Sequence, residues 1–147
     1  MNDRPSMLRH EVNKQLAFAL YGAASRMARM HKPFLEPLGL TFPQYLAMLG
    51  LLDDAPLSVG ELGSRLGMDT GTITPLVKRL QASGLVTRTR DTVDERRVLI
   101  DLTPDGRALD ADVRGVAGKI ISACQLTDEN ADDLRRTLET LAGGAGS

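Results

Sequence analysis

Two short helices joined by a three-residue link constrain the fold of this chain more than any other feature. Ser58 and Glu61 have the spacing of a capping box, in which each side chain bonds the other residue's backbone N–H at a helix start. Gly67 ends that helix, because glycine readily adopts the left-handed conformation of a C-cap. A second helix with one apolar face follows over about residues 70–83. The sequence therefore predicts a helix-turn-helix.

The segment after the second helix changes to the two-residue period of strands. Residues 85–90 and 97–102 alternate polar with apolar side chains, and a charged loop at 91–96 joins them. A strand pair of this kind directly after a helix-turn-helix predicts a winged helix-turn-helix, which we assign to residues 43–102. The expected fold class is mainly α with a small β-wing.

We call this winged helix-turn-helix the head. Long amphipathic helices are expected before and after it in the sequence. Apolar residues recur every three or four positions over 8–31, and again over about 104–124 and 128–141. Three such helices around a small head bury their apolar stripes most easily against a second copy of the chain. We therefore expect residues 1–147 to form one domain, with dimerisation helices at 8–31 and 104–142.

The charge distribution favours a nucleic-acid partner although the whole chain has a formal net charge of only −1. Residues 76–97 hold six basic and three acidic side chains, a local charge of +3, which leaves −4 for the rest. A basic stripe on an acidic body is compatible with DNA binding.

Several other classes of protein are excluded by the sequence. No apolar run reaches the roughly 18–20 residues of a membrane span, and the N-terminus lacks a signal-peptide pattern, so we expect a cytoplasmic protein with no membrane contact. One cysteine allows no intrachain disulfide. There is no phosphate-binding glycine loop, and His10, His31 and Cys124 have no metal-ligand spacing. We expect no enzyme, no metal and no cofactor.

The second helix and the strand pair supply the candidate DNA contacts. Small residues at the start of the helix allow a close approach to the major groove, where the helix dipole attracts phosphate. Basic residues further along reach phosphates or base edges, and the tip of the strand pair can enter the minor groove. The candidate residues are Thr70, Gly71, Thr72, Thr74, Pro75, Lys78, Arg79, Arg88, Arg90, Asp94 and Arg96.

Pro75 leaves two readings of the first turn open. Its ring removes the N–H that would bond the Gly71 carbonyl, which predicts a kink or a loosened turn. Alternatively, Thr70–Thr74 is a loop.

With these residues in place, the chain resembles the MarR family of bacterial regulators. The wing run Asp94–Glu95–Arg96 is followed by Leu102–Thr103 in a D-x-R-x-x-x-x-x-L-T spacing. Within the family it looks most like the OhrR branch, the sensors of organic hydroperoxides, over about residues 14–110. The matching runs are Gln15–Leu16 with Phe18–Ala19–Leu20–Tyr21, Leu38–Gly39–Leu40–Thr41 with Pro43–Gln44–Tyr45, and Gly71–Thr72–Ile73–Thr74–Pro75–Leu76 with Lys78–Arg79–Leu80.

The resemblance implies a homodimeric transcriptional regulator, most commonly a repressor, on a pseudo-palindromic double-stranded DNA operator. Asp69–Arg79 would be the recognition helix. Arg96 would insert into the minor groove, with Asp94 orienting it through a charge-assisted hydrogen bond.

The chain departs from the OhrR branch at its sensing site. Those sensors carry a reactive cysteine in a Leu–Cys–Phe run, where this chain has Ala17. Two tyrosines that bond the cysteine are replaced by His31 and Phe42. These linked replacements indicate a lineage that no longer senses peroxide through a thiol.

The resemblance places a pocket between the dimer helices and the DNA-binding heads. Its expected lining is Ala17, Tyr21, His31, Phe42 and Tyr45. Such a pocket would take a small apolar or aromatic acid that changes the spacing of the heads. His31 has a second reading as an exposed residue at a helix end.

Two alternative functions stay open at this point. Cys124 is either a small apolar filler in the stripe of its helix or the thiol of a redox-responsive repressor. The winged helix is either a DNA-binding head or a protein-interaction module without DNA binding, although its basic residues favour DNA.

Overall fold

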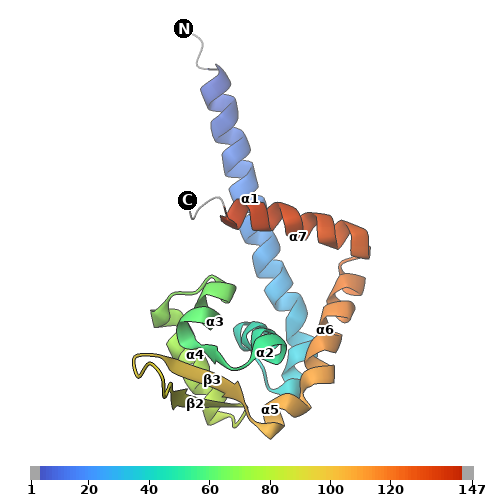
Figure 1. The fold of residues 1–147 in the computed structure, drawn as a ribbon. Helices are drawn as coiled ribbons and strands as arrows, with labels where there is room; N and C mark the ends of the chain where they lie inside the picture. Colours follow the sequence, from blue (N-terminus) through green and yellow to red (C-terminus); the bar gives the residue numbers. More distant parts are fainter. Residues whose placement is uncertain (1–3, 144–147) are drawn as a thin grey trace.

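The computed structural model describes residues 4–143, and Figure 1 shows their arrangement. The helices are α1 (Arg4–Leu35), α2 (Phe42–Asp54), α3 (Val59–Leu66), α4 (Thr70–Ala82), α5 (Pro104–Ala108), α6 (Asp110–Ala123) and α7 (Asp128–Gly143), with one 3-10 turn, η1 (Glu36–Leu38). The strands are β1 (Leu57–Ser58), β2 (Val86–Arg90) and β3 (Val98–Leu102). The expected mainly α fold with a small β-wing is confirmed.

The helix-turn-helix forms through local hydrogen bonds that the sequence predicts. The Ser58 hydroxyl accepts from the Glu61 N–H, and the Glu61 carboxylate accepts from the Ser58 N–H, both at 3.0 Å. Gly67 closes α3 with a left-handed φ of 65°. Asp69 then caps α4, since its Oδ1 accepts from the Thr72 N–H at 2.9 Å.

Thr70–Thr74 is helix and not loop, so that alternative reading of the sequence is wrong. Helix α4 begins at Thr70 and continues through Pro75. The Asp69 cap compensates for the missing Pro75 N–H, and Ile73 and Val77, which are 1% and 0% exposed, fix the opposite face in the core.

The sheet has one strand more than the sequence predicts. β1 pairs antiparallel with β3, and β3 pairs with β2, in the order β1-β3-β2. A two-residue strand gives no periodicity, so sequence analysis missed it. It matters because it ties the start of α3 to the base of the wing.

Helix α1 runs to Leu35, although we expected Pro33 to end the helix at residue 31. Pro33 lies in the last turn, where a missing N–H costs one hydrogen bond. Leu35 is 1% exposed, so its burial in the core offsets that loss and continues the helix.

The helix expected over 104–124 is divided at Leu109 into α5 and α6. Thr103 caps α5 as predicted: its hydroxyl accepts from the Gly106 N–H at 3.1 Å and donates to the Gly84 carbonyl at 2.6 Å. These bonds hold α5 against the base of the wing. Helix α6 then packs along α1 and α2 (Figure 1).

The core lies inside the head and along its contact with α6. Its fully buried side chains come from the end of α1 and from α2, α3, α4, β3 and α6, and the largest include Leu35, Met48, Leu51, Leu62, Leu80, Ile100 and Val116. This packing holds the wing, α4 and the lower part of α1 as one unit.

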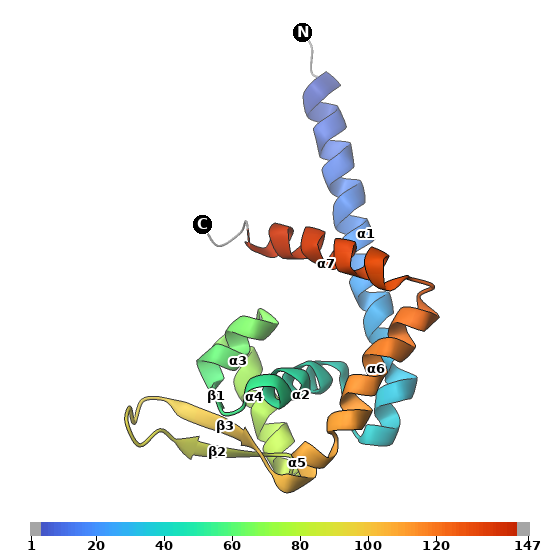
Figure 2. The same cartoon turned by 45° about the vertical axis from the view of Figure 1, so that its right-hand side comes forward.

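Helices α1 and α7 leave much of their apolar surface uncovered. Figure 2 shows the N-terminal end of α1 projecting away from the head. Phe18 and Tyr21 are 69% and 78% exposed, and α7 has no buried residue. Among residues 4–143, no helix combines the length and apolarity needed to cross a membrane.

Substitution of Gly106 tests how closely α5 packs against Leu85 and Leu102. A Cβ at this position would overlap the Leu85 carbonyl oxygen and press on a Leu102 methyl group. We therefore expect Gly106→Ala to lower the free energy of unfolding by about 1–3 kcal/mol, measured by denaturant titration. Gly60→Ala is the control, because a Cβ there meets only the Ser58 hydroxyl at 3.9 Å. Equal stability of the two variants would contradict the close seating of α5.

Candidate functional site

The outer face of α4 carries the small and basic residues that the sequence analysis proposed as DNA contacts. Thr70, Gly71, Thr72, Pro75, Lys78 and Arg79 are exposed, and Thr74 is half-buried. The inner face is fixed in the core by Ile73, Leu76, Val77 and Leu80. Because the two faces differ so strongly, α4 can present only this outer surface to a partner.

The wing tip is organised by Asp94. Its Oδ1 accepts from both the backbone N–H and the Nε of Arg96, each at 3.1 Å. The Arg96 side chain remains 91% exposed at the end of the loop. A pre-oriented, solvated guanidinium at a protruding tip has the geometry needed to enter a narrow groove.

The bonds from Arg96 lower the pKa of the Asp94 carboxyl below its usual value. A lowered folded-state pKa means that this contact is present above the ordinary aspartate range and is lost as the pH falls through the lowered pKa. The carboxylate therefore stays charged and orients Arg96 throughout the physiological range.

Arg90 closes the base of the wing loop. Its Nη1 donates to the Glu95 carbonyl oxygen at 2.8 Å, while the Asp91 carboxylate accepts from the Val93 N–H at 3.0 Å. Arg90 thus has a clear role in shaping the loop, which spacing alone did not reveal. Arg97 likewise pairs with Glu61 at 2.8 Å and joins the wing to α3.

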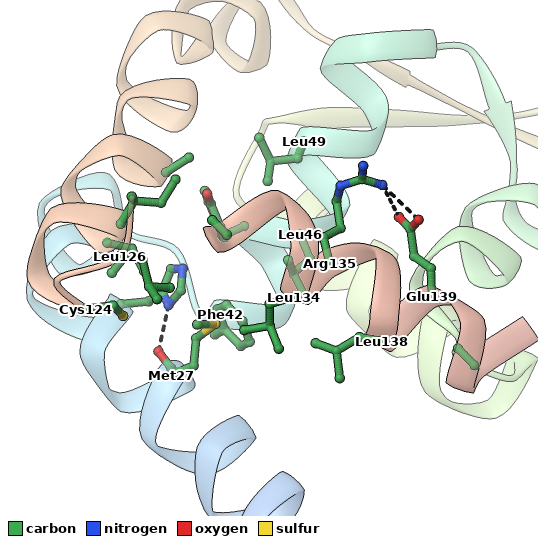
Figure 3. Close-up of a pocket in the computed structure, with 17 residues that line it drawn as sticks. Met27, Phe42, Leu46, Leu49, Cys124, Leu126, Leu134, Arg135, Leu138 and Glu139 are labelled. Carbon is green, nitrogen blue, oxygen red and sulfur yellow. Dashed lines mark hydrogen bonds and ion pairs between the residues drawn. The ribbon is translucent and has the colours of Figure 1, made fainter. Parts of the chain in front are cut away.

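A second candidate site is a cavity of about 510 Å³ between the end of α1, α2, α6 and α7 (Figure 3). Its walls are almost entirely apolar. The residues that line it are Met27, His31, Phe42, Tyr45, Leu46, Leu49, Ala117, Ile120, Ile121, Cys124, Leu126, Ala131, Leu134, Arg135, Leu138, Glu139 and Ala142.

Three of the five residues expected to line a pocket meet in this cavity. The His31 ring centroid lies 4.5 Å from that of Phe42 and 5.4 Å from that of Tyr45. Ala17 and Tyr21 do not reach it within one chain. They lie on α1 ten or more residues before His31, about 15 Å or more along the helix axis.

His31 is not an exposed residue at a helix end, so that reading is wrong. It is 5% exposed, and α1 continues beyond it. Its Nδ1 lies 2.7 Å from the Met27 carbonyl oxygen, so Nδ1 carries the proton and Nε2 is the acceptor in the neutral ring.

Burial raises the pKa of Tyr45 above its usual value, so its hydroxyl stays protonated at neutral pH. The cavity therefore combines apolar walls with a potential donor from Tyr45 and an imidazole from His31. These are the kinds of group that orient a small ligand in an apolar pocket.

Helix α7 supplies a wall that sequence reasoning missed. Ala131, Leu134 and Leu138 face the cavity, and Arg135 bonds Glu139 at 2.8 Å beside it (Figure 3). The three- and four-residue spacing of these residues indicates an apolar stripe but not what the stripe packs against, and the sequence analysis assigns it to dimerisation alone.

Cys124 lies half-buried at the end of α6. It borders the cavity, and its Sγ is 4.0 Å from the Met30 Sδ. A thioether contact does not stabilise a thiolate, so this environment favours the packing role of Cys124 over a reactive one.

Comparison with known proteins gives the family. Residues 38–97 match the model of the MarR family. The chain is 40% identical over 131 residues to the organic hydroperoxide resistance transcriptional regulator of Bacillus subtilis, covering 89% of each protein.

Solved structures agree with this likeness. Reduced AbfR bound to DNA, a protein of Staphylococcus epidermidis, matches with a TM-score of 0.76 and 30% identity over 95% of this chain and 99% of that one. CouR from Rhodococcus jostii RHA1, bound to p-coumaroyl-CoA, matches with a TM-score of 0.75 and 26% identity over 86% and 91%.

The Bacillus subtilis relative is a transcriptional regulator and not an enzyme, and some of the similar structures contain DNA. The chain, with its winged head, is a member of the MarR family of transcriptional regulators.

Proposed function

We propose that this protein is a homodimeric transcriptional repressor that binds a pseudo-palindromic DNA operator. The observation that carries this proposal is the pairing of the exposed face of α4 with the solvated, pre-oriented Arg96 at the wing tip. One element suits a major groove and the other a neighbouring minor groove. Because the MarR family is bacterial and the proposed target is DNA, the proposed site of action is the cytoplasm.

In this proposal the residues have distinct tasks. Thr70, Gly71 and Thr72 bring the start of α4 to the floor of the major groove, while Lys78 and Arg79 reach phosphates or base edges. Arg96 reads the minor groove. A protein-interaction module would not need a cationic tip that is 91% exposed and held in place by an aspartate.

The apolar surface of α1 and α7 supports a second copy of the chain as the partner. Large apolar side chains that are at least a third exposed cluster on these two helices: Met7, Leu8, Val12, Leu16, Phe18, Tyr21, Met27, Leu134, Leu138 and Leu141. Monomeric proteins rarely leave such extended apolar patches in water. A two-fold dimer would cover them and present two heads to half-sites about 34–36 Å apart.

We further propose that a small apolar or aromatic acid in the α1–α2–α6–α7 cavity controls DNA binding. The cavity lies between the head, which supplies α2, and the dimerisation helices, so a ligand there can bias the position of one against the other. Control by thiol oxidation is less favoured, because Ala17 replaces the reactive cysteine of the OhrR branch. The ligand carried by CouR, a thioester of an aromatic acid, is compatible with this chemical class.

The wing assignment is tested by removing the Arg96 guanidinium. Arg96→Ala should weaken binding to the protein's own upstream DNA by ~1–3 kcal/mol, measured by fluorescence anisotropy. Asp94→Asn should cost less, and the double variant should bind no worse than Arg96→Ala, because Asp94 acts through Arg96.

The control for this test is Arg136→Ala, which removes an exposed arginine on α7 that bonds Asp133. Its affinity should equal that of the wild type. All variants should keep the dimer mass, twice 15.9 kDa. Unchanged affinity of Arg96→Ala would refute the minor-groove role, and a wild-type protein that binds no duplex at low salt would leave the protein-interaction module as the better description.

The ligand proposal is tested by filling the cavity. Benzoate and 1-naphthoate should shift the NMR signals of His31 and Tyr45 at millimolar concentration and weaken DNA binding. Ala131→Phe, which places a ring inside the cavity, should abolish both effects. Ala111→Phe puts the same ring on the exposed start of α6 and should leave them intact. If the two acids shift no signal in the wild type, this class of ligand is wrong.

A further inference from the structure

Arg88 is an arginine on the inner face of the sheet. Along β2 the side chains alternate, so Arg88 shares its face with Val86, which is 2% exposed. Its cross-strand neighbour is Ile100, which is fully buried. Arg88 is half-buried there, and the buried part of a charged side chain normally has a hydrogen-bond partner.

No such partner is present in the part of the chain that the structure describes. The Nε of Arg88 is buried without a hydrogen-bond acceptor, and no carboxylate lies within ion-pair distance of its guanidinium. The other wing arginines differ, since Arg90, Arg96 and Arg97 each bond a carbonyl or carboxylate oxygen. A buried cationic donor without an acceptor is costly, and an anion that binds from outside would remove that cost.

Arg88 lines a cleft that an anion can enter from solvent. The cleft has a volume of about 390 Å³ and lies between the starts of α3 and α4 and the base of the wing. Its lining includes three arginines, Arg88, Arg96 and Arg97, and no acidic side chain. The hydroxyl-bearing residues Thr70 and Thr74 form the α4 side. We call this the Arg88 cleft.

The cleft lies between the two elements proposed to contact DNA. Thr70 starts α4, and Arg96 belongs to the wing tip. A duplex that meets both elements passes its sugar–phosphate backbone over the gap between them. Arg96 and Arg97 already pair with Asp94 and Glu61, but the Arg88 guanidinium has no carboxylate partner among the described residues. Hydroxyl and guanidinium donors match the acceptor oxygens of a phosphate better than they match a base edge.

We propose that the Arg88 cleft seats one backbone phosphate of the bound DNA. This inference rests on the proposed function and extends it. Arg88 and the half-buried Thr74 fix the register of the head on the duplex, whereas Arg96 and the fully exposed residues of α4 carry sequence discrimination. Because the contact is to a phosphate, its contribution is the same for every sequence and depends on salt.

The test uses Arg88→Gln in the full-length protein, with binding to the upstream DNA and to a mixed-sequence duplex at several salt concentrations. The affinity should fall by the same factor for both duplexes, so the ratio of the two affinities is unchanged. The slope of log K against log salt should fall by about 1 for each cleft occupied, hence by about 2 for a dimer. Arg88→Lys should keep most of the slope.

Arg65→Gln is the matched control, because Arg65 lies on the same head but pairs with Asp54 at its surface. Arg65→Gln should change neither the slope of log K against log salt nor the ratio of the affinities for the two duplexes. Thr74→Val is a second variant in case Arg88→Gln does not fold. It should lower affinity equally for both duplexes without changing the slope, since it removes no charge.

Each remaining outcome overturns the inference. An unchanged slope in folded Arg88→Gln would mean that Arg88 only protects the sheet edge from pairing with other strands. A loss confined to the upstream DNA would make Arg88 a base reader. Tight binding of inorganic phosphate to the wild type, with duplex binding unaffected by Arg88→Gln, would make the cleft a free-anion site. If the wild type binds no duplex at all, the proposed function fails instead.

Discussion

The burial of one face of α4 is the constraint on which the proposed DNA-binding surface depends. Ile73, Val77 and Leu80 are at most 1% exposed and interlock with α2, α3 and the sheet. Rotating α4 by even one residue would bring Thr72 or Lys78 into that core, at a cost of several kcal/mol for an unpaired charge. The outward direction of the polar face is thus a consequence of packing, and no contact with DNA is needed to establish it.

The wing depends on a different kind of interaction. Its tip has almost no buried surface, and Val93 is 93% exposed, so packing cannot fix its shape. Short-range bonds from Asp91 and Asp94 to nearby backbone N–H groups do so instead. Local bonds of this type define a loop at low cost in buried area and leave the tip free to protrude. In the proposed complex, the packed α4 and the locally bonded wing would therefore meet DNA with different stiffness.

The sequence predicted the parts of the fold that local chemistry determines. The caps at Ser58 and Thr103 follow from rules that involve neighbouring residues, and so does the helical reading of residues 70–83. The errors arose where contacts between distant residues matter. Burial of Leu35 carries α1 past Pro33, and α5, which lies close to Leu85 at Gly106, ends at Leu109 before α6 begins. For the same reason, the α7 wall of the cavity and the buried Nε of Arg88 could not be deduced from spacing, because each depends on segments far apart in the chain.

The unequal anchoring of the cavity walls determines which of them can respond to a ligand. Helix α2 contributes Tyr45, which belongs to the core at 3% exposure, so moving it would disturb the whole head. Helix α7 has no buried residue, and Leu134 and Leu138 are 47% and 39% exposed, so contacts within its own chain hold α7 less firmly than they hold α2. A ligand of the kind proposed for this cavity would therefore shift α7 before it shifts α2. If α7 also belongs to the dimer surface, as its exposed leucines indicate, that shift acts directly on the separation of the two heads, and no path through the core of either head is required.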